Sequence, residues 1–480
     1  MDFTRRPHVF SSVSAFLIGI FLLCMGSPLH ASDPHSASYS SDNSNIFWFF
    51  IISDTHIGAR GSPGNERLEW LMSEASHVIN PAFIVNTGDL TDSTNWSDTG
   101  YPDGPHAEEW IQYRDILDRN GVDASFYYDL PGNHDHFGDR DFAYYLSYSI
   151  QGEASGQTQF SWTRSFDFGT YHFLGVNTCG NDGADFSVSP PYYGDHAGLD
   201  STELQFIRDE LEANKDADLT MIFGHHLLTK RETDWSYVTG EALEEMTMTA
   251  LSYGEDEFIA LMNDYHPLMY AYGHSHVYRE EFFTKDMSEG VFYLNVASMT
   301  RNDEKNYSIV AIDNNGISTK GATIGVWPAV LITAPLDRNL GMRNDPYTAE
   351  VTDFTGSAKP IRALVFDSNP VTRVDYRMYK ILEDTGDVVG VATEEVSGSD
   401  NVEAMWFPMT QVPPAHPSYP YLWEAECPNP LEGGDYTIEV RATGSSTQRD
   451  AVPTSYPADP VGDEGCFITA ASFGGWGMLP

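Results

Sequence analysis

Basic residues and cysteine are scarce in this chain. Its 480 residues include 26 Lys and Arg against 70 Asp and Glu, and only 4 cysteines. The formal net charge of −44 repels polyanions, which argues against a nucleic-acid-binding protein, because non-specific binding to nucleic acid requires a basic surface. So acidic a composition is typical of proteins in saline surroundings, where salt screens self-repulsion.

Long hydrophobic runs are also rare. The apolar stretch 13–23 follows Arg5 and Arg6 and precedes the small residue Ala31, which is the pattern of a secretory signal peptide over residues 1–31. The alternative is an uncleaved membrane anchor, but this stretch is too short to span a bilayer and no other is long enough. We therefore expect no transmembrane helix in the mature chain, and a secreted, periplasmic or cell-surface protein.

Export would place the remaining cysteines in an oxidising compartment. These are Cys179, Cys427 and Cys466. One disulfide is then possible, and Cys427 with Cys466 is the favoured pair because both lie in the last third, amid turn-rich sequence. Cys179 is left as a buried thiol.

The length predicts two domains. After a polar linker over residues 32–45, the apolar run 46–52 indicates a central strand buried on both faces. Residues 66–79 have helical spacing and residues 83–85 return to strand, which makes a βαβ unit. The alternation continues through residue 324. Further elements are a helix over 108–119, a strand over 126–128, a helix opened by a capping pair of Asp200 and Glu203, and strands at 171–176, 220–223, 268–272, 291–296 and 309–312.

The pattern changes in residues 325–480. Helical spacing disappears, Pro and Gly become frequent, and short β-type runs dominate, as at 329–332, 363–366, 374–379 and 436–440. This spacing predicts an all-β immunoglobulin-like domain. The stretch 397–420 is expected to be a long loop or an edge insertion.

Five short polar segments recur through the first domain. Each closes or closely follows an apolar run that reads as a buried strand, so the side chains would collect at the carboxyl ends of strands, where α/β sheets bind ligands. The segments are Asp54-Thr55-His56, Gly88-Asp89, Gly132-Asn133-His134-Asp135, Gly224-His225-His226 and Gly273-His274-Ser275-His276. The glycines are expected to let the chain turn sharply out of each strand.

The residue types in these segments are those that hold two divalent cations. Carboxylate, imidazole and amide oxygen donors suit Mn, Fe, Zn or Co. Any one of these residues alone would more often be structural, but five such segments in order favour a metal centre. The predicted metal ligands are Asp54, His56, Asp89, Asn133, His225, His274 and His276.

The order of the segments resembles the calcineurin-like metallophosphoesterases over residues 46–315. The resemblance implies an α/β fold of two β-sheets flanked by helices. It also implies a ligand partition: Asp54, His56 and His276 on the first metal, Asn133, His225 and His274 on the second, and Asp89 bridging both.

A narrower likeness is to the transmembrane protein 62 family. It lies in residues 88–92, in Glu109, Trp110 and Tyr113, and in residues 327–333. Trp110 and Tyr113 are nevertheless expected to be core residues of their helix rather than base-stacking groups. Purple acid phosphatases place a Tyr three residues after the bridging Asp, and Asp92 stands there in this chain, so a tyrosinate-bound ferric ion is not expected.

The predicted reaction is hydrolysis of a phosphomonoester or phosphodiester by a hydroxide held between the two cations. His134 is predicted to protonate the leaving oxygen, with Asp135 or a backbone carbonyl orienting its ring. The alternative is that His134 only shapes the site. His136 and His226 adjoin these residues, with structural roles favoured over substrate contact.

The substrate is expected to be small or exposed, such as an extracellular nucleotide, a phospholipid headgroup or another organic phosphate. Two other functions remain open. One is a surface binding protein whose metal site is structural or vestigial. The other is a metal-dependent nuclease of the same superfamily, which the charge disfavours.

Overall fold

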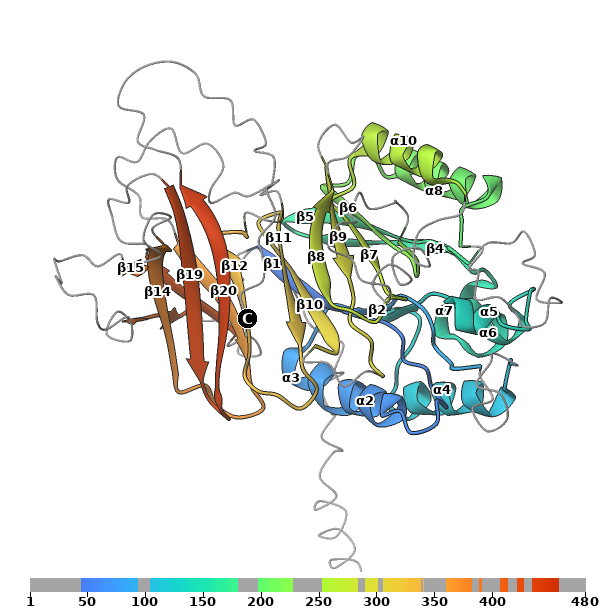
Figure 1. Cartoon of the computed structure of the whole chain (residues 1–480), viewed down its shortest axis with the longest axis horizontal. Helices are drawn as coiled ribbons and strands as arrows, with labels where there is room; N and C mark the ends of the chain where they lie inside the picture. Colours follow the sequence, from blue (N-terminus) through green and yellow to red (C-terminus); the bar gives the residue numbers. More distant parts are fainter. Residues whose placement is uncertain are drawn as a thin grey trace, which may run out of the picture.

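The structure is a computed structural model in which two β-rich units lie side by side (Figure 1). It describes residues 45–93, 104–179, 197–227, 253–283, 290–300, 305–337, 340, 360–381, 388–390, 406–412, 421–426 and 434–456. The predicted signal peptide, nearly all of the predicted linker, and Cys427 and Cys466 lie outside these residues.

The first sheet of the N-terminal unit has the order β11-β10-β1-β2-β3. Its strands are β1 (Ile46–Ile52), β2 (Ile84–Asn86), β3 (Tyr127–Asp129), β10 (Tyr307–Asp313) and β11 (Gly316–Ala322). The first three are parallel, and β10 runs antiparallel to β1. Every residue of β1 is buried, which confirms the central strand predicted from its apolar run.

The second sheet has the order β4-β5-β6-β7-β9-β8. Its strands are β4 (Phe160–Phe166), β5 (Gly169–Gly175), β6 (Leu219–Phe223), β7 (Met269–Tyr272), β8 (Arg279–Phe283) and β9 (Val291–Asn295). The four inner strands are parallel, and the two edge strands are antiparallel to their neighbours. Both sheets therefore present parallel strands whose carboxyl ends can meet.

Helices cover the outer face of each sheet (Figure 1). On one side lie α2 (Gly64–Trp70), the π-helical turn η2 (Leu71–Ala75), α3 (Ser76–Ile79) and α4 (Ala107–Arg119); on the other lie α8 (Ser201–Ala213) and α10 (Glu255–Tyr265). The short helices α5 (Asn133–His136), α6 (Ala143–Tyr148) and α7 (Ile150–Ser155) follow β3. Trp110 and Tyr113 of α4 are fully buried, as predicted.

Aromatic side chains fill the space between the two sheets. Phe49 of β1 stacks on Phe83 with ring centroids 4.6 Å apart. Phe173 of β5 lies 4.8 Å from Phe83, and Phe223 of β6 lies 6.4 Å from Phe49. This packing fixes the two sheets face to face and sets the distance between their carboxyl ends.

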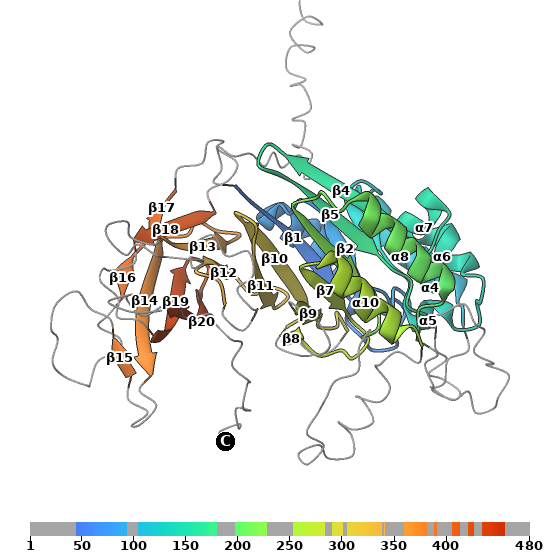
Figure 2. The same ribbon diagram turned by 90° about the horizontal axis from the view of Figure 1, so that it is seen from above.

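The C-terminal unit consists of two further sheets (Figure 2). One has the order β12-β13-β18-β17, the other β15-β14-β19-β20, with β16 also paired to β14. The strands are β12 (Ala329–Ala334), β13 (Pro360–Phe366), β14 (Arg373–Ile381), β15 (Val388–Gly390), β16 (Phe407–Pro408), β17 (Thr410–Gln411), β18 (Leu422–Glu426), β19 (Gly434–Thr443) and β20 (Thr447–Tyr456). The strands predicted here are present, and the immunoglobulin-like assignment stays a prediction. Within the stretch 397–420, β17 lies at a sheet edge.

The two units share a hydrophobic core. Trp48 of β1 packs on Phe366 of β13 and on Tyr421, with ring centroids 5.4 Å and 5.8 Å away. Asp313 of β10 is fully buried. It accepts a hydrogen bond from Thr333 Oγ1 at 2.7 Å and forms an ion pair with Arg362, whose Nε lies 3.0 Å from Asp313 Oδ2. The C-terminal sheets therefore complete the core and balance a buried charge of the N-terminal unit.

The sequence also predicts a buried thiol at Cys179 and no transmembrane helix in the mature chain. Cys179 is buried, as predicted. Among the described helices, none has the length and apolar content that a bilayer crossing requires.

The N-terminus of α8 contains a buried carboxyl group. Asp200 Oδ1 accepts hydrogen bonds from the N–H groups of Thr202 and Glu203, and Glu203 Oε2 accepts one from the Asp200 N–H at 3.1 Å. This confirms the predicted capping pair. Glu203 is 1% exposed, and burial together with the adjacent Asp200 raises its pKa from 4.5 to about 8.

The raised pKa makes stability depend on pH. Below pH 4.5, Glu203 is protonated in both the folded and the unfolded chain. Between pH 4.5 and about pH 8 it is protonated only in the folded chain. The free energy of unfolding therefore falls as pH rises through this interval. We expect Glu203→Gln to remove this pH-dependent part of the free energy of unfolding. The stability of the variant relative to the parent should therefore rise between pH 4.5 and about pH 8. Urea unfolding of both proteins at several pH values tests this, and parallel stability curves would contradict it.

Candidate metal centre

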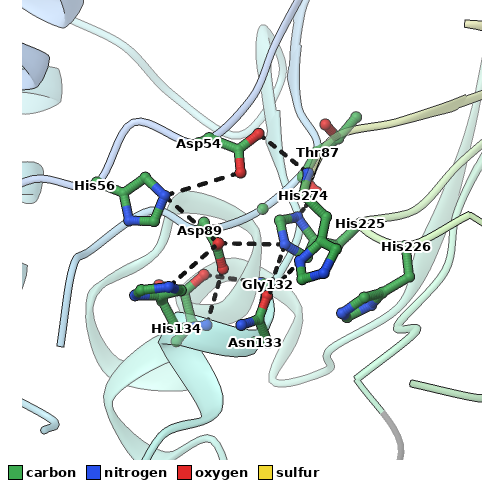
Figure 3. Close-up of polar contacts among 12 residues, drawn as sticks. Asp54, His56, Thr87, Asp89, Gly132, Asn133, His134, His225, His226 and His274 are labelled. Carbon is green, nitrogen blue, oxygen red and sulfur yellow. Dashed lines mark hydrogen bonds and ion pairs between the residues drawn. The ribbon is translucent and has the colours of Figure 1, made fainter. Parts of the chain in front are cut away.

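The five polar segments follow the carboxyl ends of five parallel strands, three in the first sheet and two in the second. They come after β1, β2 and β3, and after β6 and β7. The structure brings all seven predicted ligands together there. Figure 3 labels Asp54, His56, Asp89, Asn133, His225 and His274 among them. Packing of the two sheets therefore converts distant sequence segments into one cluster.

One half of the cluster consists of Asp54, His56, Asp89 and His276. His276 Nε2 lies 3.0 Å from Asp54 Oδ1 and 3.2 Å from His56 Nε2. His56 Nε2 lies 3.6 Å from Asp89 Oδ2. This is the set expected around the first metal.

The other half is formed by Asn133, His225 and His274, again beside Asp89. Asn133 Oδ1 lies 3.0 Å from His225 Nε2 and 2.9 Å from His274 Nδ1. His225 Nε2 is also 3.3 Å from Asp89 Oδ2. The Asp89 carboxylate thus lies between the two halves, as a bridging ligand would.

The donor atoms have the spacing and protonation that metal ligands need. Neighbouring ligands around one ion at about 2.1 Å lie roughly 3 Å apart, close to the separations found here. His225 Nδ1 lies 3.0 Å from the Thr87 carbonyl oxygen, which can only accept, so Nδ1 carries the hydrogen. In the neutral ring, His225 Nε2 then has a lone pair for a metal. The residues therefore fit a divalent metal centre.

Five of the predicted ligands have left-handed backbone conformations. The φ angles are 52° at Asp54, 40° at His56, 52° at Asp89, 66° at His274 and 59° at His276. This conformation costs an L-residue about 1–2 kcal/mol and clusters at functional sites. The ligands themselves, rather than the preceding glycines alone, make the sharp turns out of the strands.

The glycines are needed for a different reason at two positions. A Cβ on Gly132 would lie 2.2 Å from the backbone nitrogen of Asp89, and one on Gly273 would lie 1.8 Å from Ser53 Oγ. Neither glycine has a positive φ. Here the missing side chain allows neighbouring loops to approach closely, whereas the sequence predicts that these glycines let the chain turn sharply out of the strand.

Buried charges shift each other's protonation in the cluster. Burial raises the pKa of Asp89, but the His225 and His134 imidazoles outweigh it and hold that pKa well below its usual range. Against burial, His276 and His225 lower the pKa of Asp54 to about 2. Burial lowers the pKa of His225, but Asp89 raises it to about 9. Protons on the imidazoles therefore compete with metal binding.

Asp135 does not lie where an orienting partner of His134 would. Its carboxylate accepts hydrogen bonds from the N–H groups of Gly132, Leu90 and Thr91, at 2.9, 3.0 and 3.0 Å. Burial and the charge of Asp89 raise its pKa to about 7. Asp135 thus joins the two loops that carry Asp89 and Asn133, and its predicted part in orienting the His134 ring is corrected.

Asp92 contacts both His134 and His56. Its backbone carbonyl accepts a hydrogen bond from His134 Nδ1, which is the backbone alternative predicted for orienting that ring. Its carboxylate Oδ1 lies 3.3 Å from His56 Nδ1. In the sequence, its position three residues after Asp89 indicates only a departure from the purple acid phosphatases.

The site opens to solvent on one side. The His134 and His276 side chains are 21% and 19% exposed, whereas Asp54, His56, Asp89 and His225 are all buried. Burial lowers the pKa of His134, but Asp89 and the Asp92 carbonyl raise it above its usual value. His134 and His276 therefore lie at a solvent-exposed side of the cluster.

Comparisons with known proteins bear on this arrangement. A family model for calcineurin-like phosphoesterases matches residues 47–278. Transmembrane protein 62 of Mus musculus is 27% identical over 367 residues, which are 75% of this chain and 50% of the mouse protein. An Arabidopsis thaliana protein provisionally named a metallophosphoesterase is 30% identical over 117 residues, 23% of this chain and 16% of that protein. The chain thus spans half or less of these relatives.

Among solved structures, a purple acid phosphatase from yellow lupin (Lupinus luteus) seeds matches with a TM-score of 0.34 and 13% identity, over 61% of this chain and 52% of the lupin chain. A likeness this slight supports no statement about fold or function. The family model and the two relatives confirm the predicted superfamily and branch. Residues 47–278 of this chain are therefore a calcineurin-like phosphoesterase domain, the domain of metal-dependent phosphoester hydrolases.

Proposed function

We propose that this protein is an exported phosphoesterase that hydrolyses a small or exposed phosphomonoester or phosphodiester at a centre of two divalent metal ions. The observation that carries this is the convergence of seven ligand side chains, from both sheets, with donor atoms 2.9–3.6 Å apart. The predicted leader and the acidic composition support an extracellular, non-polymeric substrate.

The proposed division of the ligands between two ions is the one that the family resemblance implies. Asp54, His56 and His276 would hold one, Asn133, His225 and His274 the other, and Asp89 both. A bound pair of Mn, Fe, Zn or Co ions would supply a hydroxide nucleophile and neutralise phosphoryl oxygens. The protein holds the ligands in a largely buried cluster, which strengthens those charge interactions.

His134 is positioned to donate a proton. Because the Asp92 carbonyl can only accept, His134 Nδ1 carries the hydrogen of that bond. The other nitrogen, Nε2, lies 4.0 Å from Asp89 Oδ2 at the solvent-exposed side of the site. A leaving oxygen entering from solvent would meet Nε2.

Asp92 is proposed as a positioning residue for both histidines. A carboxylate beside the distal nitrogen of a ligating imidazole fixes its orientation and raises its basicity, and losing such a partner lowers metal affinity about 10- to 100-fold. The carboxylate of Asp92 has that relation to His56. Its carbonyl holds His134 independently.

The first prediction concerns activity. The protein loaded with Mn²⁺ should hydrolyse an aryl phosphate or an aryl phosphodiester, and Asp89→Ala should lower kcat/KM at least about 100-fold because it removes the group shared by both halves of the centre. Asp118→Ala, which removes a carboxylate 54% exposed on α4, is the matched control. Absence of metal-dependent turnover on a broad panel would favour the surface-binding alternative, and cleavage of an oligonucleotide at low salt would favour the nuclease.

The second prediction concerns the leaving group. His134→Ala should slow alkyl phosphates, which have poor leaving groups, by about 100-fold or more, because the leaving oxygen then lacks its proton donor. Nitrophenyl esters should be affected far less, since nitrophenolate leaves without protonation. Steady-state rates across a leaving-group series test this. An equal loss for all esters would show that His134 only shapes the site.

The third prediction concerns metal affinity. Asp92→Asn should weaken Mn²⁺ binding at the half containing His56 by about 10- to 100-fold, while keeping the backbone carbonyl that holds His134. Calorimetric titration of metal-free protein measures both sites, with Asp118→Asn as the control. Unchanged affinity at both sites would contradict the proposed role of Asp92.

A further inference from the structure

His226 follows the predicted ligand His225 but has a different environment. It lies in the loop after β6, 1% exposed. Its carbonyl oxygen accepts a hydrogen bond from Tyr270 Oη at 2.6 Å. Its ring lies beside those of His225 and His274, with centroids 4.8 Å and 4.6 Å away, at the second half of the cluster (Figure 3).

One hydroxyl group determines which nitrogen of His226 carries hydrogen. Thr178 Oγ1 accepts hydrogen bonds from the backbone N–H groups of His225 and His226, at 3.2 Å and 3.1 Å. These two donors occupy both lone pairs of the hydroxyl oxygen. The same oxygen lies 2.9 Å from His226 Nδ1, so the remaining interaction is donation of the hydroxyl hydrogen to Nδ1. The neutral ring must then carry its hydrogen on Nε2.

This Nε2–H group is buried and has no hydrogen-bond partner among the described residues. A buried donor without an acceptor costs free energy, whereas every other polar group of the Thr178–His226 contact is satisfied. The ring is held from two sides, by Thr178 at Nδ1 and by Tyr270 at the carbonyl. The structure thus holds a fixed hydrogen-bond donor at the candidate metal centre, and the described part of the chain supplies no acceptor for it.

We propose that His226 contacts the substrate by donating a hydrogen bond from Nε2 to a phosphoryl oxygen. This rests on the proposed function of the site. The phosphoryl group would lie on the side of the second metal position, next to His274 and Asn133, opposite the proton donor His134. A donor fixed in a buried site is most effective where negative charge increases in the transition state.

The competing role for His226 is that of a metal ligand. Its ring nitrogens lie near those of His225 and His274, so the three imidazoles form a geometrically possible metal group. However, a nitrogen that carries hydrogen has no lone pair for a metal, and the Thr178 contacts place hydrogen on Nε2. Measurements of metal content and of phosphate affinity therefore distinguish a metal ligand from a hydrogen-bond donor to phosphate.

The experiment compares the Mn²⁺-loaded full chain with His226→Leu and His226→Gln. Leu removes the donor, whereas Gln places an amide N–H near the position of Nε2. Metal content is measured on the purified proteins, and inorganic phosphate binding by calorimetry. We expect all three to hold the same number of Mn²⁺ ions, His226→Leu to bind phosphate about 10- to 100-fold more weakly, and His226→Gln to restore most of that affinity.

Three outcomes would overturn the proposal: loss of a metal ion in His226→Leu, which would make His226 a ligand; unchanged phosphate affinity; or no recovery in His226→Gln with its metal content intact. Because phosphate binding is measured without turnover, failure of this proposal can be distinguished from failure of the proposed function. If the parent binds Mn²⁺ and phosphate but hydrolyses no ester, the proposed function fails while the phosphate contact of His226 is still decided.

Discussion

The carboxylate of Asp89 is the group on which the rest of the site depends. It is 1% exposed, and a charge so buried requires partners on all sides. One oxygen accepts the His134 N–H at 2.8 Å; the other lies near His56 of the first sheet and His225 of the second. A single buried charge thus joins the loops of both sheets, and any shift in their packing would separate it from its partners.

The left-handed backbone conformations of the ligands cost free energy, and hydrogen bonds between the loops offset this cost. Asp54 N–H donates to the Gly88 carbonyl, His56 N–H to the Asp89 carbonyl, and His274 N–H to the Asp54 carboxylate, at 2.9, 2.9 and 3.2 Å. All three donors belong to residues with positive φ. These three strained conformations are therefore each held by a hydrogen bond to another loop of the cluster, which preorganises the ligands before a charged substrate binds.

The sequence predicts those strands and site residues whose burial or spacing leaves a pattern in the residue types. Fully buried parallel strands leave continuous apolar runs, so β1 and the segments after it could be found. The edge strands β4 and β8 were missed because only part of their surface is buried and their sequences mix charged and aromatic residues. Asp92, Asp135 and Thr178 act through contacts with residues distant in sequence or through backbone atoms, and residue type and spacing carry no signal for these.

The C-terminal sheets also stabilise the core that lies beneath the metal ligands. Without them, Trp48 would lose its contacts with Phe366 and Tyr421, and Asp313 would be left without Arg362 and Thr333. An unpaired buried carboxylate destabilises a fold strongly, and β10, which carries Asp313, pairs with β1, the strand that leads to Asp54 and His56. Loss of activity on removing the C-terminal unit would therefore report damage to the core beneath the ligands, and would not by itself show that this unit binds substrate or a surface.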